Sequence, residues 1–219
     1  TNPMHADLAW STVGVFSSAD VKENPSTGLA TLTSEQFGSS FNLCKTERFF
    51  EQPSAAFCSG SLVGPDIIIT AGHCVRTEQA CANTKFVFGF NIKDKNGKAP
   101  ETVPLDDVVQ CKSIIAREET GDGADFAVIR INRKVTKYKP LQIHRNQNVT
   151  KGMKLVMIGH PSGLPTKVDD GGSVRDPSPN GFFVATTDSY GGNSGSAVLN
   201  LETGEVEGIL VRGEQDFVY

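Results

Sequence analysis

The stretch Gly191-Gly192-Asn193-Ser194-Gly195-Ser196 decides how the rest of the chain is interpreted. Its three glycines let backbone N–H groups point inward without obstruction by a Cβ atom. The apolar residues that follow, 197–199, predict a strand directly after this loop. Ser194 is therefore a candidate nucleophile, but a serine hydroxyl at neutral pH is weak and needs a base within hydrogen-bond reach.

Two further segments offer a base and a carboxylate. Thr70-Ala71-Gly72-His73-Cys74 follows a predicted strand, and Asp125-Phe126-Ala127-Val128-Ile129 opens another. An imidazole at His73 would accept the serine proton and return it to a leaving amine, and a carboxylate at Asp125 would fix the imidazole tautomer. The competing Asp122 lies in the turn Gly121-Asp122-Gly123, where aspartate is a common turn former. Each residue alone has an ordinary structural interpretation, whereas the order histidine, aspartate, serine indicates a catalytic triad.

These motifs, with a cysteine pair that flanks the histidine strand, resemble the chymotrypsin-like serine peptidase superfamily from about Ala9 onward. The Gly-Asn-Ser-Gly-Ser pattern is similar to the bacterial branch that includes the glutamyl endopeptidases. The resemblance implies a triad of His73, Asp125 and Ser194, an oxyanion hole formed by the N–H groups of Gly192 and Ser194, and a disulfide between Cys58 and Cys74.

Short strands separated by turn residues fill the rest of the chain. The predicted strands are Val13–Phe16, Ala55–Val63, Asp66–Thr70, Lys85–Phe90, Val108–Ala116, Phe126–Ile131, Lys154–Gly159, Phe182–Thr186, Ala197–Asn200 and Val206–Val211. This spacing, with 22 Gly and 11 Pro in 219 residues, favours an all-β sandwich or pair of barrels. We predict loops over 17–52, with one hairpin, and over 161–179, and no helix beyond a short one after His73.

The resemblance narrows this fold class to two packed six-stranded antiparallel β-barrels of the chymotrypsin-like type. Residues 1–139 would form the N-terminal barrel with His73 and Asp125, and residues 140–219 the C-terminal barrel with Ser194. Only 25 residues follow Ser194, fewer than the second barrel normally has. We therefore expect that barrel to be incomplete and hypothesise that a C-terminal piece is absent from this chain.

The resemblance also implies a substrate pocket around the nucleophile loop. In trypsin-like enzymes an aspartate six residues before the nucleophile receives Arg or Lys, and Asp188, followed by Ser189, holds that position here. The pocket wall would run from Gly208 to Gly213, with Gly213 near the mouth of the pocket, and Leu210 stands where glutamyl endopeptidases carry a histidine that receives glutamate. We predict cleavage after Arg or Lys; the alternative is that Asp188 braces its loop and points away from the pocket. Asn193 is uncharged, so activation by an N-terminal amine paired with an aspartate is not expected.

Cysteine usage favours disulfides and an oxidising compartment. No C-x-x-C pair occurs among the five cysteines, and adjacent His73 and Cys74 are poor joint ligands, so no metal is expected. Cys81 and Cys111 precede or lie on strands that are candidate neighbours, which makes them a second candidate bridge. Cys44 is then either free or paired with a cysteine outside this chain.

Charge and hydropathy limit the classes of binding partner that we expect. The net charge of −4 gives no electrostatic argument for nucleic acid or an anionic membrane, and no apolar run approaches the ~18 residues of a membrane span. We expect protein or peptide substrates, no cofactor, a monomer, and a secreted or periplasmic location, with the N-terminus a processed end because it lacks a signal-peptide pattern.

Two other protein classes compete with a triad peptidase. An α/β-hydrolase needs G-x-S-x-G and the chain order serine, acid, histidine, and neither is present. A protease-like binding module that lost activity remains the main alternative. His5, His144 and His160 lack comparable contexts and are predicted to lie at the surface or in loops.

Overall fold

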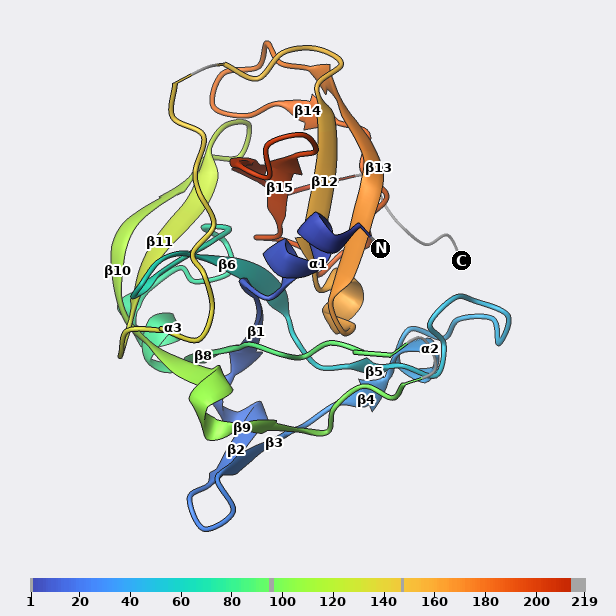
Figure 1. Cartoon of the computed structure of the whole chain (residues 1–219), viewed down its shortest axis with the longest axis vertical. Coiled ribbons are helices and arrows are strands. Elements are labelled where there is room, and N and C mark those ends of the chain that lie inside the picture. Colours follow the sequence, from blue (N-terminus) through green and yellow to red (C-terminus); the bar gives the residue numbers. More distant parts are fainter. Residues whose placement is uncertain (1, 95–96, 147, 214–219) are drawn as a thin grey trace.

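The computed structural model describes residues 2–94, 97–146 and 148–213, and strands dominate it (Figure 1). In the first half the strands are β1 (Thr12–Ser17), β2 (Val21–Asn24), β3 (Leu29–Leu32), β4 (Glu35–Gln36), β5 (Pro53–Ser54), β6 (Cys58–Gly64), β7 (Ile67–Thr70), β8 (Thr84–Val87), β9 (Thr102–Pro104), β10 (Val108–Glu119) and β11 (Asp125–Ile131). In the second half they are β12 (Lys154–Gly159), β13 (Lys167–Asp176), β14 (Val184–Ala185), β15 (Ala197–Asn200) and β16 (Val206–Ile209). The helices are α1 (Pro3–Ala9), α2 (Phe37–Ser40) and α3 (Glu78–Ala82), with 3₁₀ turns at Ser18–Asp20, Leu105–Asp107 and Pro161–Gly163.

The N-terminal half is a closed antiparallel barrel with strand order β1-β6-β7-β11-β10-β8. Successive side chains of a strand face opposite sides, and β11 follows this rule by burying Ala127, Ile129 and Ile131 in the barrel core. Closure leaves no unpaired strand edge in the barrel. The barrel therefore holds the ends of β7 and β11 rigidly, and these are the ends that carry His73 and Asp125.

The C-terminal half is a curled five-stranded sheet of order β14-β13-β12-β15-β16, which lies above the barrel in Figure 1. The all-β, chymotrypsin-like prediction is confirmed, but within the described residues the second unit is not a closed six-stranded barrel. Its core includes Leu155, Val156 and Ile158 of β12 together with Leu199 of β15. Strand β12 is thus buried on both faces and was easy to predict.

Strand β13 corrects the prediction of a loop over 161–179. Its sequence is polar and contains Gly171 and Gly172, and much of it is half-buried or exposed. Nevertheless it pairs with β12 over Lys154 to Gly159. A neighbouring buried strand, rather than an intrinsic β preference of the segment, makes this stretch a strand.

Helix α1 was not predicted, because seven residues are too few for a helical period to stand out. Its start is nonetheless marked in the sequence: the Asn2 Oδ1 accepts a hydrogen bond from the Met4 N–H at 3.0 Å, and Pro3 occupies the first turn. Among the described residues, no helix is long and apolar enough to cross a membrane.

The structure contains both predicted disulfides, Cys58–Cys74 and Cys81–Cys111. The second joins helix α3 to strand β10, so the two segments are neighbours as expected. Cys44 is a free, exposed thiol. Whether it has a partner outside this chain stays a prediction.

Candidate active site

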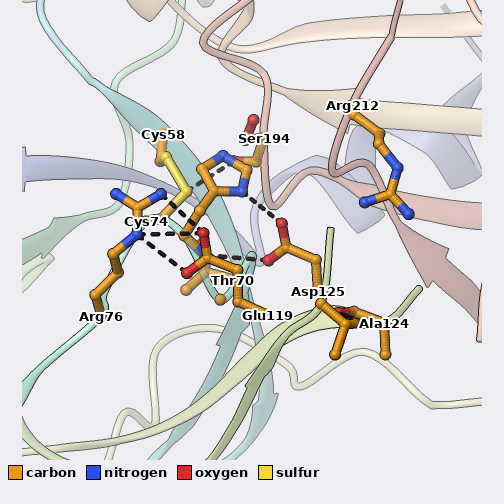
Figure 2. Close-up of polar contacts among 12 residues, drawn as sticks. Cys58, Thr70, Cys74, Arg76, Glu119, Ala124, Asp125, Ser194 and Arg212 are labelled. Carbon is orange, nitrogen blue, oxygen red and sulfur yellow. Dashed lines mark hydrogen bonds and ion pairs between the residues drawn. A yellow bond between two sulfur atoms is a disulfide. The ribbon is translucent and has the colours of Figure 1, made fainter. Parts of the chain in front are cut away.

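His73 and Asp125 are brought together by the pairing of two barrel strands. β7 and β11 run antiparallel with Thr70 opposite Ala127, so the residues just beyond these positions meet at one end of the pair. The His73 Nδ1 lies 2.7 Å from Asp125 Oδ2, and the His73 main-chain N–H donates to Oδ1 at 3.1 Å (Figure 2). The Asp125 side chain is only 8% exposed. One oxygen of the Asp125 carboxylate thus contacts the main chain of His73 and the other contacts its ring. This contact favours the tautomer with the proton on Nδ1, which leaves Nε2 able to accept a proton.

Gly72 permits this close approach. A Cβ at this position would lie 2.2 Å from the Glu118 carbonyl oxygen and 3.0 Å from Asp125 Oδ1. Real Cβ atoms do not come so close to backbone oxygens, so a side chain here would push the histidine away from its carboxylate. Close packing therefore explains why Thr70-Ala71-Gly72-His73-Cys74 has a glycine at position 72.

Ser194 reaches the site from the other half of the molecule, from the turn just before β15. The Ser59 N–H of β6 donates to the Ser194 carbonyl at 2.8 Å and joins the nucleophile loop to the barrel. Within the described part of the chain, the Ser194 Oγ makes no hydrogen bond to His73. Such catalytic hydrogen bonds often tighten only when substrate is present.

The Gly191–Gly192 peptide is oriented by a loop that sequence reasoning did not connect to the site. The Ser162 N–H donates to the Gly191 carbonyl at 2.7 Å. Because the peptide is trans, the Gly192 N–H points in the opposite direction. Gly192 has φ +81°, which side-chain-bearing residues rarely adopt. Among the described residues neither this N–H nor that of Ser194 donates to another group, so both are available to an oxyanion.

Asn193 is buried, with 2% of its surface exposed, and its side chain joins residues of the loop that carries Ser194. Its Oδ1 accepts a hydrogen bond from the Ser196 hydroxyl, and its Nδ2 donates to Ser189 Oγ at 2.9 Å. The neutral amide therefore acts as acceptor and donor at once, which a carboxylate cannot do. The sequence showed that residue 193 is uncharged but not that its side chain holds the loop together.

We expect Asn193→Asp to lower the free energy of unfolding by about 1–3 kcal/mol, because Ser189 loses its donor and a carboxylate is buried without a cation. The rate of covalent labelling by a fluorophosphonate should fall about 10- to 100-fold as the loop loses its geometry. Urea denaturation and labelling time courses measure both quantities. The exposed Asn148 provides the control: Asn148→Asp adds the same charge and should change neither. Equal effects of the two substitutions would contradict the assignment.

His160 lies in the loop that follows β12, as predicted, but it is not at the surface. It is fully buried, stacks on Phe90 and places Nδ1 2.9 Å from the Leu164 carbonyl. Nδ1 must carry the proton to bond a carbonyl, and the buried Nε2 has no partner among the described residues. Burial lowers the pKa of His160 to about 4. His5 contradicts the prediction, because it is buried and lies in helix α1. His144 is half-buried and pairs with Glu207 at 2.8 Å.

The depressed pKa of His160 predicts loss of stability in weak acid. The unfolded chain takes up a proton near the ordinary histidine pKa of about 6.5, whereas the folded chain does so only near 4. The stabilisation is therefore complete above about pH 6.5 and falls by about 3 kcal/mol as the pH drops to about 4. Urea denaturation at several pH values should show this slope, and His160→Gln should remove it.

His144 provides a control of opposite sign. The hydrogen bond that His144 donates to the Glu207 carboxylate raises the pKa of His144. Its contribution is therefore present below the unfolded pKa and is lost as the pH rises through the folded pKa. His144→Gln should leave the acid slope of His160 in place. An acid slope that survives His160→Gln would contradict the prediction.

A hollow of about 840 Å³ opens beside Ser194. Ser194 and Asp125 line it, as do the predicted pocket residues Ser189, Leu210 and Gly213. Asp188 does not line it: this residue is exposed, and its main-chain N–H donates to Asp169 Oδ2 at 2.8 Å. The structure thus brings three of the four predicted pocket residues to the hollow and places the predicted anchor for Arg or Lys outside it.

The ligand atoms of Cys58, His73 and Cys74 all lie within 4.8 Å of one another, which is close enough to suit a metal ion. Both sulfurs, however, are bonded to each other in a disulfide and offer no thiolate. The cluster is therefore explained by the disulfide that anchors the histidine loop.

Comparison with known proteins agrees with this geometry. A model of the family described as "Trypsin-like peptidase domain" matches residues 58–209. The structure of Rv3671c protease in its inactive form is similar, with a TM-score of 0.58 at 15% identity over 99% of this chain and 83% of that one. A serine endoprotease from Yersinia pestis gives a TM-score of 0.57 at 18% identity over 96% of this chain, which spans only 56% of that chain. Deg5 gives 0.54 at 18% identity, over 95% and 82% of the two chains. No curated protein matches.

Proposed function

Because the chain belongs to the family of trypsin-like peptidase domains, we propose that it is a serine endopeptidase with His73, Asp125 and Ser194 as its catalytic triad. The observation that carries the proposal is the buried Asp125 carboxylate held at 2.7 Å from the His73 Nδ1. A carboxylate in this position favours the imidazole tautomer with the proton on Nδ1. Nε2, on the side of the ring away from Asp125, is then unprotonated and can act as a base.

In the proposed reaction, Ser194 Oγ attacks the carbonyl carbon of the scissile peptide while His73 Nε2 takes the hydroxyl proton. The carbonyl oxygen becomes an oxyanion and accepts hydrogen bonds from the N–H groups of Gly192 and Ser194. The imidazolium returns the proton to the amine as the C–N bond breaks, which leaves an acyl-enzyme. Water then attacks the ester with His73 again as the base, and the proton returns to Ser194 as the acid product leaves.

Cleavage after Arg or Lys remains the prediction for the residue directly before the scissile bond. Ser189, Leu210 and Gly213 support a pocket at that place, since they line the hollow beside Ser194. The exposed position of Asp188 gives the prediction no support. Two disulfides support the further proposal that the protein works in an oxidising, secreted or periplasmic location.

Labelling by a fluorophosphonate tests the proposal directly, because only an activated serine is phosphonylated. We expect the native protein to be labelled at Ser194 and a peptide mixture to be cleaved. An unlabelled, inert protein that still binds peptides would instead identify the protease-like binding module. Peptides that differ only in having Arg, Glu or Phe before the scissile bond would decide the preference, and equal turnover of all three would remove the Arg/Lys prediction.

A further inference from the structure

Two arginines bring positive charge to the hollow beside the nucleophile. Arg175 and Arg212 both belong to its lining and both are exposed. Neither arginine makes an ion pair with a carboxylate in the described ranges of the chain. The hollow therefore presents two guanidinium groups without a direct carboxylate partner among the described residues, although Arg175 interacts electrostatically with the neighbouring Asp176 carboxylate.

The two carboxylates of the same lining are already engaged. Asp125 binds the imidazole of His73. The Glu207 side chain is 2% exposed and accepts hydrogen bonds from His144 at 2.8 Å and from the Asn200 amide at 3.1 Å. Both carboxylates already have partners, so among the charged side chains of the lining only the two arginines lack a direct ion-pair partner in the described residues.

Arg212 is held in a defined position across the hollow. Its Nη2–H donates to the Gly123 carbonyl at 2.7 Å, and its Cζ lies 4.9 Å from the centre of the Phe182 ring. Figure 2 shows the side chain extending in the direction of the segment at Ala124. One hydrogen bond uses one of the five guanidinium donors, and the contact with the Phe182 ring is a cation–π contact that uses no hydrogen-bond acceptor. An edge of the guanidinium remains for an acceptor such as a carboxylate.

The place of Arg212 along a bound peptide follows from the backbone. The Leu210 carbonyl accepts a hydrogen bond from the Gly195 N–H at 2.7 Å, which locates Leu210 at the nucleophile loop. The main-chain groups of Val211 and Arg212 make no hydrogen bonds within the described residues, so this segment can pair with an extended peptide. Arg212 lies two residues beyond Leu210, about 6–7 Å along an extended chain.

We propose that Arg212 is a specificity-determining residue that favours Asp or Glu two to four residues before the scissile bond. The inference rests on the proposed function, because it deepens the substrate class of the same site. A guanidinium edge and a carboxylate match in geometry and form charge-assisted hydrogen bonds. The preference concerns positions upstream of the residue that enters the pocket, so it is separate from the preference predicted from Asp188.

Peptide sets that vary one upstream position at a time, with the residue before the scissile bond constant, test the proposal. We expect kcat/KM for Asp or Glu to exceed that for Gln by about 10-fold at one of the three positions, with the advantage shrinking at high salt. Arg212→Gln should abolish the advantage, and Arg212→Glu should transfer it to Lys at the same position. The exposed Arg145, outside the hollow, is the control: Arg145→Gln should leave the preference unchanged.

Equal turnover of acidic and neutral peptides by the native protein would overturn the proposal. So would an Arg212→Gln variant that loses turnover of all peptides to the same extent, since this would make Arg212 only a brace for the loop at Gly123. The dissociation constants of the Ser194→Ala variant for the same peptides give a readout that needs no turnover. A native protein without labelling or cleavage would overturn the peptidase proposal, whereas absence of an acidic preference in these dissociation constants would overturn the role of Arg212.

Discussion

Ser194→Ala is expected to reduce kcat/KM for any cleaved peptide by a factor on the order of 10⁵–10⁶ and to abolish labelling by a fluorophosphonate. The hydroxyl is the group that forms the acyl-enzyme in the proposed reaction, with the imidazole of His73, held by Asp125, as its base. The oxyanion donors would survive the substitution, so a small residual rate over water remains expected. Steady-state assays with high enzyme concentration are needed to measure it.

The substitution should leave the fold intact, which separates a chemical loss from unfolding. The Ser194 Oγ makes no hydrogen bond in the part of the chain that the structure describes, so the free energy of unfolding should change by less than about 0.5 kcal/mol. The exposed Ser178 is a control, and Ser178→Ala should retain full activity. More than a few per cent of native activity in Ser194→Ala would remove Ser194 as the nucleophile.

The barrel strands were predictable because their own sequences carry the signal. β7 and β11 have apolar residues that the barrel buries on one side, and turn residues bound them. β13 was missed because its own residues are largely polar and only partly buried, and its strand conformation comes from its pairing with β12. The number of strands in the second half likewise depends on long-range pairing, which no local pattern specifies.

The site shows the same division between local and tertiary information. His73, Asp125 and Ser194 each follow or open an apolar strand, so their contexts could be recognised separately and then combined. The bond from Ser162 to Gly191 and the buried amide of Asn193 join loops whose contact exists only in the fold. From the sequence, a role for residues such as these could be suggested only through the resemblance to a known family.

Asp188 and Arg212 illustrate why the pocket was the least predictable part. Asp188 was assigned to the pocket by counting back from Ser194, but the direction of a loop residue is set by the path of the loop. That path places Asp188 beside Asp169, at the surface. Arg212 carried no motif, and only its contacts with Gly123 and Phe182 bring it to the hollow.

Asp125→Asn is expected to lower kcat by about 10⁴-fold while the protein stays folded. An asparagine has nearly the same shape, and its Oδ1 can still accept the His73 main-chain N–H that Asp125 accepts at 3.1 Å. Its amide group can instead donate to Nδ1, which favours the imidazole tautomer with the proton on Nε2. A protonated Nε2 cannot take the proton of Ser194, so the base is lost although every residue remains in place.

Asp122 provides the matched control, because it is the carboxylate that the sequence offered as an alternative. It is exposed in the turn at 121–123 and shows no contact with the imidazole, so Asp122→Asn should keep kcat within about 2-fold. Circular dichroism and urea denaturation of both variants confirm that each is folded. A loss in Asp122→Asn equal to that in Asp125→Asn would mean that overall negative charge near His73, and not the bond to Nδ1, supports the reaction. With Asp122→Asn active and Asp125→Asn folded but inert, the 2.7 Å contact itself carries the catalytic effect.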